Sequence, residues 1–265
     1  MQRQNAIRDS FFADILDELR QTIHPGLEIR LCTTQAEFAA CIELHQGIWN
    51  FAPKEVLSAR TLALANLTGG HVYGVYRDGK LIAFALAFMA IRDGSPYLHS
   101  NIVAVLPSFQ GKRIGRLIKL YQREQAMQHG IQRIEWTFDP LETRNAYFNI
   151  TKLGAQSHRF ISNLYGVSTS PLHRNLPTDR LVAKWELDSE QVHCALAGRA
   201  ICQPPASHKA VIRLPRNIDA IRVSAPEQIE VLQANLRRQF MDEFQKGLAV
   251  TAFELSESEA HYFLN

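Results

Sequence analysis

The stretch Leu98–Gly115, LHSNIVAVLPSFQGKRIG, predicts a buried strand, a glycine-containing loop and the start of a helix. Ile102–Leu106 is an apolar run rich in β-branched residues, as in a buried strand, and Pro107 ends it. Apolar residues at helical spacing follow the stretch. At such a junction free backbone N–H groups meet the positive end of a helix dipole, and Lys112 and Arg113 add cations. The stretch therefore predicts a phosphate site, and the alternative is an ordinary strand-to-helix connection.

The composition is typical of a globular α/β chain with a sizeable core. The 265 residues are 46% hydrophobic and 21% charged, enough for one large domain or one domain with an appendage. A net charge of +3 gives no argument for nucleic acid or a membrane as partner. No apolar run has the length of a membrane span, and charges run through the N-terminus, so we expect a cytoplasmic protein.

Cysteine and histidine spacing predicts no metal site. No CxxC pair and no HExxH sequence occurs, which favours reduced thiols over disulfides or zinc. The four cysteines are Cys32, Cys41, Cys194 and Cys202.

The order of expected elements is helix, strand, two helices, three strands, helix, strand, helix and two strands. Thr34 with Glu37 indicates a capping box, and Asp78-Gly79 indicates a hairpin turn. The helix after the loop carries Arg116, Lys119 and Arg123 off its apolar face. The expected ranges are 5–22, 27–32, 34–47, about 54–66, 72–76, 81–91, 102–106, 116–129, 131–138, 139–154, 160–166 and 180–187.

Residues 189–265 predict a small α/β extension. Short strands are expected at 211–214 and 220–223, and a final strand at 248–255. Ser224–Glu227 looks like a capping box that opens a helix ending at Gly247. The extension either completes the main sheet or forms a subunit interface, and the sequence leaves both open.

The loop Gln110–Gly115 resembles the acyl-coenzyme A loop of the GNAT N-acetyltransferase superfamily. That motif is Gln or Arg, two residues, Gly, one residue, then Gly or Ala; here Gln110 and Gly115 match, and Arg113 replaces the middle glycine. Its Cβ takes room beside a pyrophosphate, whereas its guanidinium could pair with phosphate. The resemblance implies an α/β (α+β) fold with a mixed, mostly antiparallel central sheet flanked by helices. It implies an N-terminal helix over 1–26, a GNAT domain over 27–188 and the extension over 189–265.

The segment Asp139–Gly154, DPLETRNAYFNITKLG, is similar to the helix that follows the fifth strand in GNAT proteins. Asn145, Ala146, Lys152 and Gly154 fit that frame. WTFDPLETRNAYFN, with NLYG and LPTDRLVAKWEL further on, resembles one branch of predicted GNAT acetyltransferases. Ile150 stands where many members keep a tyrosine that protonates the departing thiolate, and Ala155 replaces a closing aromatic residue. Tyr147, one helical turn earlier, is the replacement acid that we consider, with water as the alternative.

The resemblance implies transfer of an acetyl or similar group from acetyl-CoA, or another acyl-CoA, to an amine. The strand before the loop would offer backbone groups to the pantetheine arm, and the loop N–H groups would hold the pyrophosphate. The residues expected to bind the co-substrate are Val103, Val105, Gln110, Gly111, Lys112, Arg113, Ile114, Gly115 and Asn145.

His99 is the candidate general base. It precedes Gln110 by eleven positions, where histone-modifying GNAT enzymes carry a catalytic glutamate, and its ordinary pKa suits a base near neutrality. By period two, His99, Asn101, Val103 and Val105 are expected on one strand face. The alternatives are an inert histidine at a strand entrance, Glu135, and Asp139, for which we favour a turn-forming role.

The acceptor is expected to be a small-molecule amine or a protein amine, and residues 167–179 are a candidate acceptor loop or a surface crossover. A homodimer through the extension or the first helix is also expected. Because Arg113 and Ile150 depart from the family pattern, the rival interpretation is a GNAT-fold CoA-binding or assembly module without transfer activity.

Overall fold

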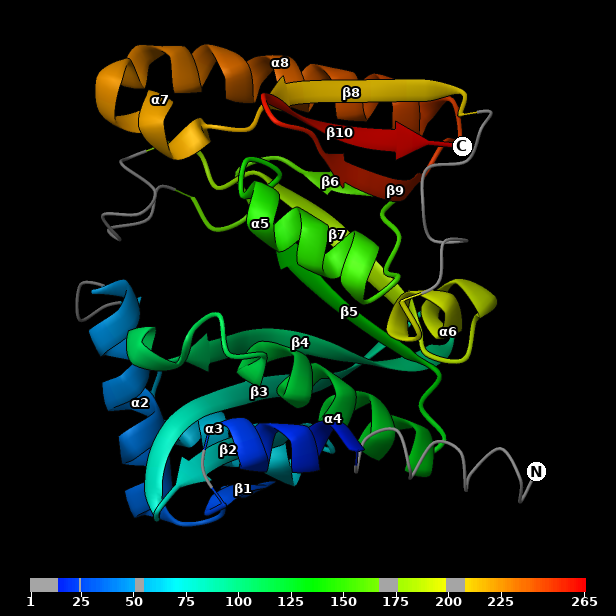
Figure 1. The fold of residues 1–265 in the computed structure, drawn as a ribbon. Coiled ribbons are helices and arrows are strands. Elements are labelled where there is room, and N and C mark those ends of the chain that lie inside the picture. Colours follow the sequence, from blue (N-terminus) through cyan, green and yellow to red (C-terminus); the bar gives the residue numbers. More distant parts are fainter. Residues whose placement is uncertain (1–13, 24, 51–54, 167–175, 199–207) are drawn as a thin grey trace. The chain divides into compact units, whose positions relative to one another are not determined.

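A computed structural model describes residues 14–23, 25–50, 55–166, 176–198 and 208–265. These residues fall into two compact units, the first ending at Ile134 and the second beginning at Glu135. Both units mix helices and strands (Figure 1). The predicted helix over 5–22 is described from residue 14 and is helical over 14–22. Its beginning, Cys202 and most of the candidate acceptor loop lie outside the described residues.

The first unit is built on four consecutive antiparallel strands, β1 to β4. They hydrogen-bond in chain order, and β2–β3 and β3–β4 are tight hairpins. Their turns are Asp78-Gly79 (φ 51° and 73°) and Asp93-Gly94 (φ 52° and 71°), the paired positive φ of the favoured two-residue hairpin. The Asp78-Gly79 hairpin is therefore confirmed. The strands are β1 (Leu27–Leu31), β2 (His71–Arg77), β3 (Lys80–Arg92) and β4 (Ser95–Val105).

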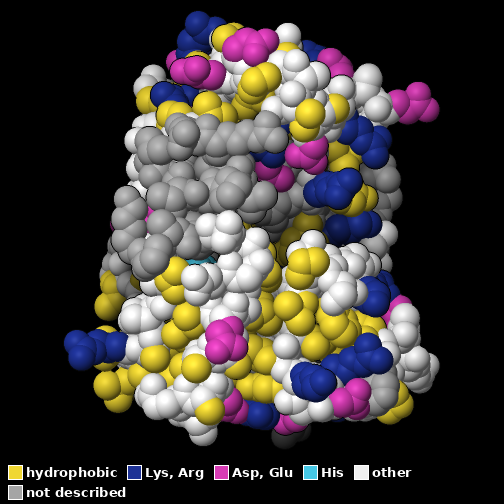
Figure 2. Space-filling view, turned by 90° about the vertical axis from the view of Figure 1, so that its left-hand side faces the viewer, with side chains coloured by type: hydrophobic (Ala, Val, Ile, Leu, Met, Phe, Trp, Pro, Cys, Tyr) yellow, Lys and Arg dark blue, Asp and Glu magenta, His cyan; other side chains and the backbone are white. Residues whose placement is uncertain are grey.

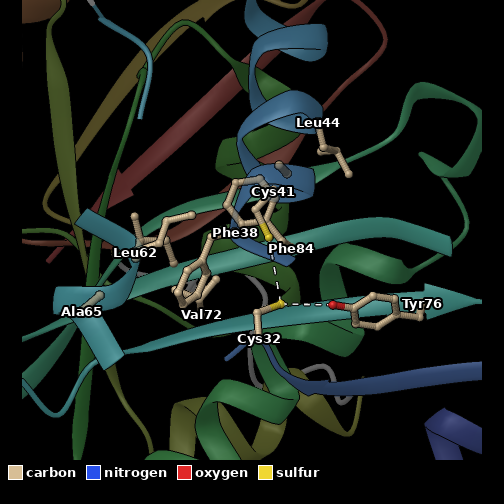
Figure 3. Packing of buried hydrophobic residues seen from close by; sticks show 11 residues of the cluster. Cys32, Phe38, Cys41, Leu44, Leu62, Ala65, Val72, Tyr76 and Phe84 are labelled. Atoms are coloured by element: carbon tan, nitrogen blue, oxygen red, sulfur yellow. Dashed lines mark hydrogen bonds between the residues drawn. The ribbon is translucent and has the colours of Figure 1, made fainter. Parts of the chain in front are cut away.

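Two helices, α2 (Gln35–Trp49) and α3 (Ala59–Leu67), cover one face of these strands. The predicted capping box is confirmed, because Thr34 Oγ1 accepts from Glu37 N–H at 3.2 Å and Thr34 N–H donates to the Glu37 carboxylate at 3.0 Å. The apolar cluster beneath the helices includes Phe38, Leu62 and Phe84 (Figure 3).

The same cluster holds two thiols. Cys32 Sγ lies 4.0 Å from Cys41 Sγ and 3.3 Å from Tyr76 Oη (Figure 3). Cys32, Cys41 and Cys194 are free thiols, all buried.

The opposite face is covered by α4 (Ile114–Gln128), whose Tyr121 ring meets Tyr73 of β2 edge-on at 4.8 Å. A short 3₁₀ turn, η2 (Pro107–Phe109), joins β4 to the loop before α4. Gly130, with a φ of +75°, follows the end of α4 as predicted. Apolar side chains of this unit are also exposed, among them Leu31, Leu64 and Leu67. Figure 2 shows hydrophobic side chains gathered in the lower half of the view.

The predicted fifth strand is β5 (Arg133–Phe138). Its first two residues belong to the first unit, and the other four belong to the second. The helix after it begins as α5 (Thr143–Ala146) and continues as a π-helix, η3 (Tyr147–Lys152). Two further strands follow, β6 (Phe160–Ile161) and β7 (Arg180–Glu186), with β7 between β5 and β6.

The extension folds as a three-stranded sheet with helices, within the second unit. The strand order is β8-β10-β9, and Phe240 of α8 meets Tyr262 of β10 edge-on at 5.1 Å. Figure 1 shows α8 running along this sheet. The elements are α6 (Glu190–Leu196), β8 (Ala210–Pro215), α7 (Ile218–Ser224), α8 (Pro226–Gln245), β9 (Val250–Leu255) and β10 (Glu259–Leu264).

Two local predictions for the extension are wrong. The expected strand at 220–223 is part of α7, because a short apolar run does not by itself distinguish a strand from a helix, and here Ala220 and Val223 are exposed. Ser224 does not cap α8: its hydroxyl donates to the Ala220 carbonyl at 3.0 Å, and Ala225 is the N-cap residue. The helix α6 and the central strand β10 were not expected from the sequence.

No helix of the described residues is both long and apolar enough to cross a membrane. In the same residues, no three His, Cys, Asp or Glu side chains are grouped so that they could hold a metal ion.

Candidate active site

The loop before α4 is held by hydrogen bonds from Gln110 to residues just before it in the chain. Gln110 N–H donates to the Pro107 carbonyl at 3.2 Å, and its side-chain amide donates to the Val105 carbonyl at 3.1 Å. The prediction that the Gln110 N–H is offered to a ligand is therefore wrong, because the 3₁₀ turn uses it. Gln110 instead ties the loop to the end of β4.

The helix N-terminus begins directly after this closure. Gly111 has a φ of +75° and Arg113 a φ of +63°, so the chain turns through two left-handed residues into α4. Leu117 N–H donates to the Arg113 carbonyl at 3.0 Å. The N–H groups of Ile114 and Gly115 come earlier, in the first turn, where a helix has no carbonyl partners of its own. These two N–H groups can therefore donate hydrogen bonds to an anion bound at the helix end.

The surroundings of this helix end are cationic. Lys112 is exposed, and its Nζ lies 5.2 Å from the centre of the Phe109 ring, while the Arg77 guanidinium lies 5.6 Å from the same centre. The first turn of α4 contains no acidic residue. Arg113 forms an ion pair with Glu18 of the N-terminal helix, both about half exposed. A phosphate would therefore have to compete with Glu18 for Arg113.

Gly115 borders open space. A Cβ built on it has no neighbouring atom within 4 Å, and its φ is outside the left-handed region. A larger side chain is thus compatible with the protein itself, although it would occupy the space in front of the helix end.

The upstream strand β4 carries a bulge. Leu86 of β3 pairs with Ile102, yet the next residue, Ala87, pairs with Ser100. Asn101 is the extra residue of β4, and its side chain is exposed. Because one extra residue reverses the alternation, side chains before and after the bulge exchange faces.

The bulge separates His99 from the expected cofactor positions. His99 pairs with Phe88 and lies on the face that α2 and α3 cover. Val103 and Val105 face the α4 side, toward which Ser100 also points. The prediction that His99, Asn101, Val103 and Val105 share one face is therefore wrong, because counting by twos assumes a regular strand.

His99 is half-buried at this position. Burial lowers its pKa below the ordinary value, and the positive charges of Lys119 and Arg92 lower it further. The imidazole is consequently neutral at neutral pH and able to accept a proton. The protonation state of His99 therefore suits a base, while its side chain lies on the face of β4 opposite Val103 and Val105.

A buried polar chain lies behind the bulge and was not expected. Lys119 Nζ donates to Ser100 Oγ at 2.8 Å, and Ser100 Oγ donates to Gln122 Oε1 at 3.1 Å. Gln122 Nε2 lies 2.9 Å from His71 Nε2, which completes the chain. The prediction that Lys119 and Arg123 lie off the buried face is wrong, since α4 is enclosed on more than its apolar stripe.

Burial favours the uncharged forms of Lys119 and His71, the two residues at the ends of this hydrogen-bonded chain of side chains. Full burial lowers the pKa of Lys119 to about 7. Burial, together with the nearby Lys119, lowers the pKa of His71 to about 3. His71 is therefore a neutral ring, and we assign its Nε2 as the acceptor of the Gln122 amide. The only signal in the sequence is the placement of polar residues next to apolar ones in α4.

The second unit carries the remaining predicted residues. Asn145 is exposed in α5, and its Oδ1 accepts from Asn149 Nδ2 at 3.3 Å. Tyr147 is partly buried, with Lys152 Nζ 5.2 Å from its ring centre. Ile150 is buried, so an apolar side chain fills the position of the family tyrosine.

Asp139 ends β5 as a turn former, which is the role that we favoured. Its Oδ1 accepts from Leu141 N–H at 2.8 Å. Burial raises its pKa, and Arg180 and Arg222 partly offset the rise. Glu135 is buried within β5. Neither carboxylate lies at the surface as an evident base.

Comparisons with known proteins give a family match over part of this chain and a similar fold. Residues 38–154 match the sequence model of the Acetyltransferase (GNAT) family. A chain of the NatC complex bound to Gag peptide and CoA is 11% identical, with a TM-score of 0.50 over 60% of this chain and 98% of that chain.

Two other solved structures are similar. The ribosomal-protein-S18-alanine N-acetyltransferase from Escherichia coli is 15% identical, with a TM-score of 0.48 over 62% of this chain and 95% of its own. A GNAT family acetyltransferase from Elizabethkingia anophelis with acetyl-CoA bound is 14% identical, with a TM-score of 0.43 over 61% and 98%. No curated protein sequence matches. Residues 38–154 therefore match the GNAT acetyltransferase family model, and the fold is of the class expected from the sequence.

Proposed function

We propose that this protein is an N-acyltransferase that moves an acetyl group from acetyl-CoA to an amine. The observation that carries the proposal is the loop Gln110–Gly115 before α4, inside a GNAT domain, with open space over Gly115 and Lys112 exposed beside it. The similar NatC structure holds CoA, which supports the same co-substrate here. The residues proposed to hold it are those expected from the sequence, with Gln110 acting through its side chain on the loop.

The chain's own groups divide the chemistry as follows. The N–H groups of Ile114 and Gly115 bind the pyrophosphate, with Lys112 beside it. His99 accepts the proton that the acceptor ammonium must lose before nitrogen can attack the thioester carbonyl. The new bond joins nitrogen to the acyl carbon, the carbon–sulfur bond breaks, and the thiolate takes a proton from Tyr147 or from water.

The acceptor is proposed to be a small-molecule or protein amine, and the protein is proposed to act in the cytoplasm. A homodimer is consistent with the exposed leucines of the first unit, Leu64 and Leu67 among them. Residues near the transfer site other than those assigned above would bind the acceptor and determine which amine is acetylated.

The test is release of free CoA thiol from acetyl-CoA by the purified protein, across a panel of amines and pH values. For His99→Ala we expect a rate at pH 7.5 lower by about a hundredfold, the usual size of a general-base contribution. Because the pKa of His99 is lowered, the wild-type rate should fall only in the acid range, below the ordinary histidine pKa. An unchanged pH profile in the variant would remove His99 as the base.

The rival is a CoA-binding module without transfer activity. It is favoured by the buried Ile150 at the tyrosine position and by Arg113 at the glycine position. Binding of acetyl-CoA without thiol release for any amine would support the rival against the proposed enzyme.

A further inference from the structure

We propose that the extension, residues 189–265, is a brace for the segment Asp139–Lys152, with Arg222 and Tyr262 as positioning residues for acetyl-CoA binding. This inference rests on the proposed function, because Asn145 of that segment is assigned to the co-substrate. All the contacts described below lie within the second unit.

The braced segment starts as a tight turn. Glu142 N–H donates to the Asp139 carbonyl at 3.1 Å, and Ala146 N–H donates to the Glu142 carbonyl at 2.9 Å. The turn therefore runs directly into α5. Any rotation at Asp139–Glu142 would be passed to Asn145 within one helical turn.

The first tie to this turn is Arg222 of α7. Its Nη1 donates to the Glu142 carboxylate, and its Nη2 lies 3.8 Å from Asp139 Oδ2. The Arg222 side chain is only 15% exposed, so these two carboxylates, with the exposed carboxylate of Asp219 at 3.2 Å, compensate a mostly buried cation. Such a pair fixes geometry well, because losing either partner leaves a charge in a poorly solvated place.

The second tie is Tyr262 of β10. Its hydroxyl donates to the Pro140 carbonyl at 2.8 Å, and the side chain is fully buried. The ring is packed edge-on against Phe253 at 4.6 Å and Phe240 at 5.1 Å. The hydroxyl is therefore held in place by the core of the extension.

A third tie holds the far end of the segment. Thr151 Oγ1 donates to the Phe253 carbonyl at 2.6 Å. Just beyond, Ser157 and Val250 exchange main-chain hydrogen bonds at 3.0 and 2.6 Å. The extension thus contacts the segment at its first turn and at its last.

The segment between these ties has a helix geometry that is uncommon by itself. Leu153 N–H donates to the Phe148 carbonyl at 3.0 Å, the five-residue step of a π-helix. Such turns are rare and occur often at functional sites. Ties at both ends would keep this geometry, and the exposed Asn145 with it, in one arrangement.

The experiment compares two matched variants of the full chain, Arg222→Met and Arg237→Met. Arg237 of α8 also pairs with a buried aspartate, donating to both oxygens of Asp179 at 2.9 and 3.0 Å, but it does not contact the turn. Thermal unfolding, acetyl-CoA calorimetry and hydrogen exchange of residues 143–152 without ligand are measured for both. Tyr262→Phe is a third variant, in case Arg222→Met does not fold.

Both arginine variants should unfold at temperatures lower by about 5 °C. Only Arg222→Met and Tyr262→Phe should speed exchange in 143–152, and only they should weaken acetyl-CoA binding, by about tenfold for Arg222→Met. Arg222→Lys should recover part of the affinity. Arg237→Met should bind acetyl-CoA within about twofold of wild type.

Equal losses of affinity in the two arginine variants would overturn the brace, because the extension would then act only through stability. Unchanged exchange in 143–152 and unchanged affinity in Arg222→Met and Tyr262→Phe would also overturn it. If the wild type does not bind acetyl-CoA, the proposed function fails, and the exchange measurement still decides whether the extension holds the segment.

Discussion

Two segments of this protein lead into helices that we propose to bind acetyl-CoA, and the two segments are held in different ways. The loop Gln110–Gly115 is closed by hydrogen bonds to neighbours in the chain, Val105 and Pro107, and its ion pair with a distant part of the described chain is the exposed pair of Arg113 with Glu18. The turn Asp139–Glu142 is held by Arg222 and Tyr262, which lie 80 and 122 positions away. The comparison shows that hydrogen bonds between near neighbours can close a loop, whereas a turn held by distant residues needs the completed fold.

The largest expected effect on the free energy of unfolding comes from removing one carboxylate at each segment, Asp139 at the turn and Glu18 beside the loop. Asp139→Ala removes the turn-forming oxygen and leaves Arg180 and Arg222 mostly buried without that charge, so we expect a loss of about 3 kcal/mol in the free energy of unfolding. Glu18→Ala removes an exposed partner and should cost less than about 1 kcal/mol. Urea denaturation measures both. Equal losses would contradict the distinction between a braced turn and a local loop.

A middle-sized effect concerns Lys119, behind the β4 bulge. With a pKa of about 7 in the folded protein, against about 10.4 when unfolded, Lys119 binds more protons in the unfolded state between these values. Stability due to this group therefore rises with pH from about 7 to about 10. Lys119→Met should remove that rise with pH, and it should increase the free energy of unfolding at pH 7 by about 1 kcal/mol.

The matched control for Lys119 is Lys246→Met, which removes an exposed lysine paired with Glu243. Its denaturation curves should follow the wild type at every pH. A parallel pH dependence in wild type and Lys119→Met would show that Lys119 stays charged in the folded protein.

The smallest expected effect lies in the loop itself. Arg113 holds a φ of +63°, which costs a side-chain-bearing residue more than glycine. Arg113→Gly should raise the free energy of unfolding by about 0.5 kcal/mol, after the greater freedom of glycine in the unfolded chain is counted. Arg113→Lys keeps the Cβ and should show no gain. A loss of stability in the glycine variant would mean that the Glu18 pair outweighs the backbone term.

The sequence was informative wherever structure depends on near neighbours. Asp78-Gly79 and the Thr34–Glu37 capping box act within a few residues, and both were recognised. The bulge at Asn101 was missed, because one inserted residue leaves no trace in an apolar alternation. That single residue moved His99 to the other face of β4.

Other features were hidden because they depend on tertiary contacts. The helical pattern predicts Lys119 as a surface residue, and only the packing of α4 against Ser100 of β4 buries it. The contact of Tyr262 with Pro140 joins elements whose partners no periodicity specifies. The Ala220–Val223 run fits a strand or a helix, and a run this short has too few residues for its period to distinguish the two.

The most direct test of the central claim, that the loop before α4 binds acetyl-CoA, is calorimetry on the wild type, Gly115→Leu and Gly47→Leu. Both glycines are helical, border open space and lie outside the left-handed region, so both variants should fold at least as stably as the wild type. We predict that Gly115→Leu weakens acetyl-CoA binding at least about a hundredfold, because its side chain covers the helix end, while Gly47→Leu binds normally. Equal affinity in the two variants would contradict the assignment of the loop.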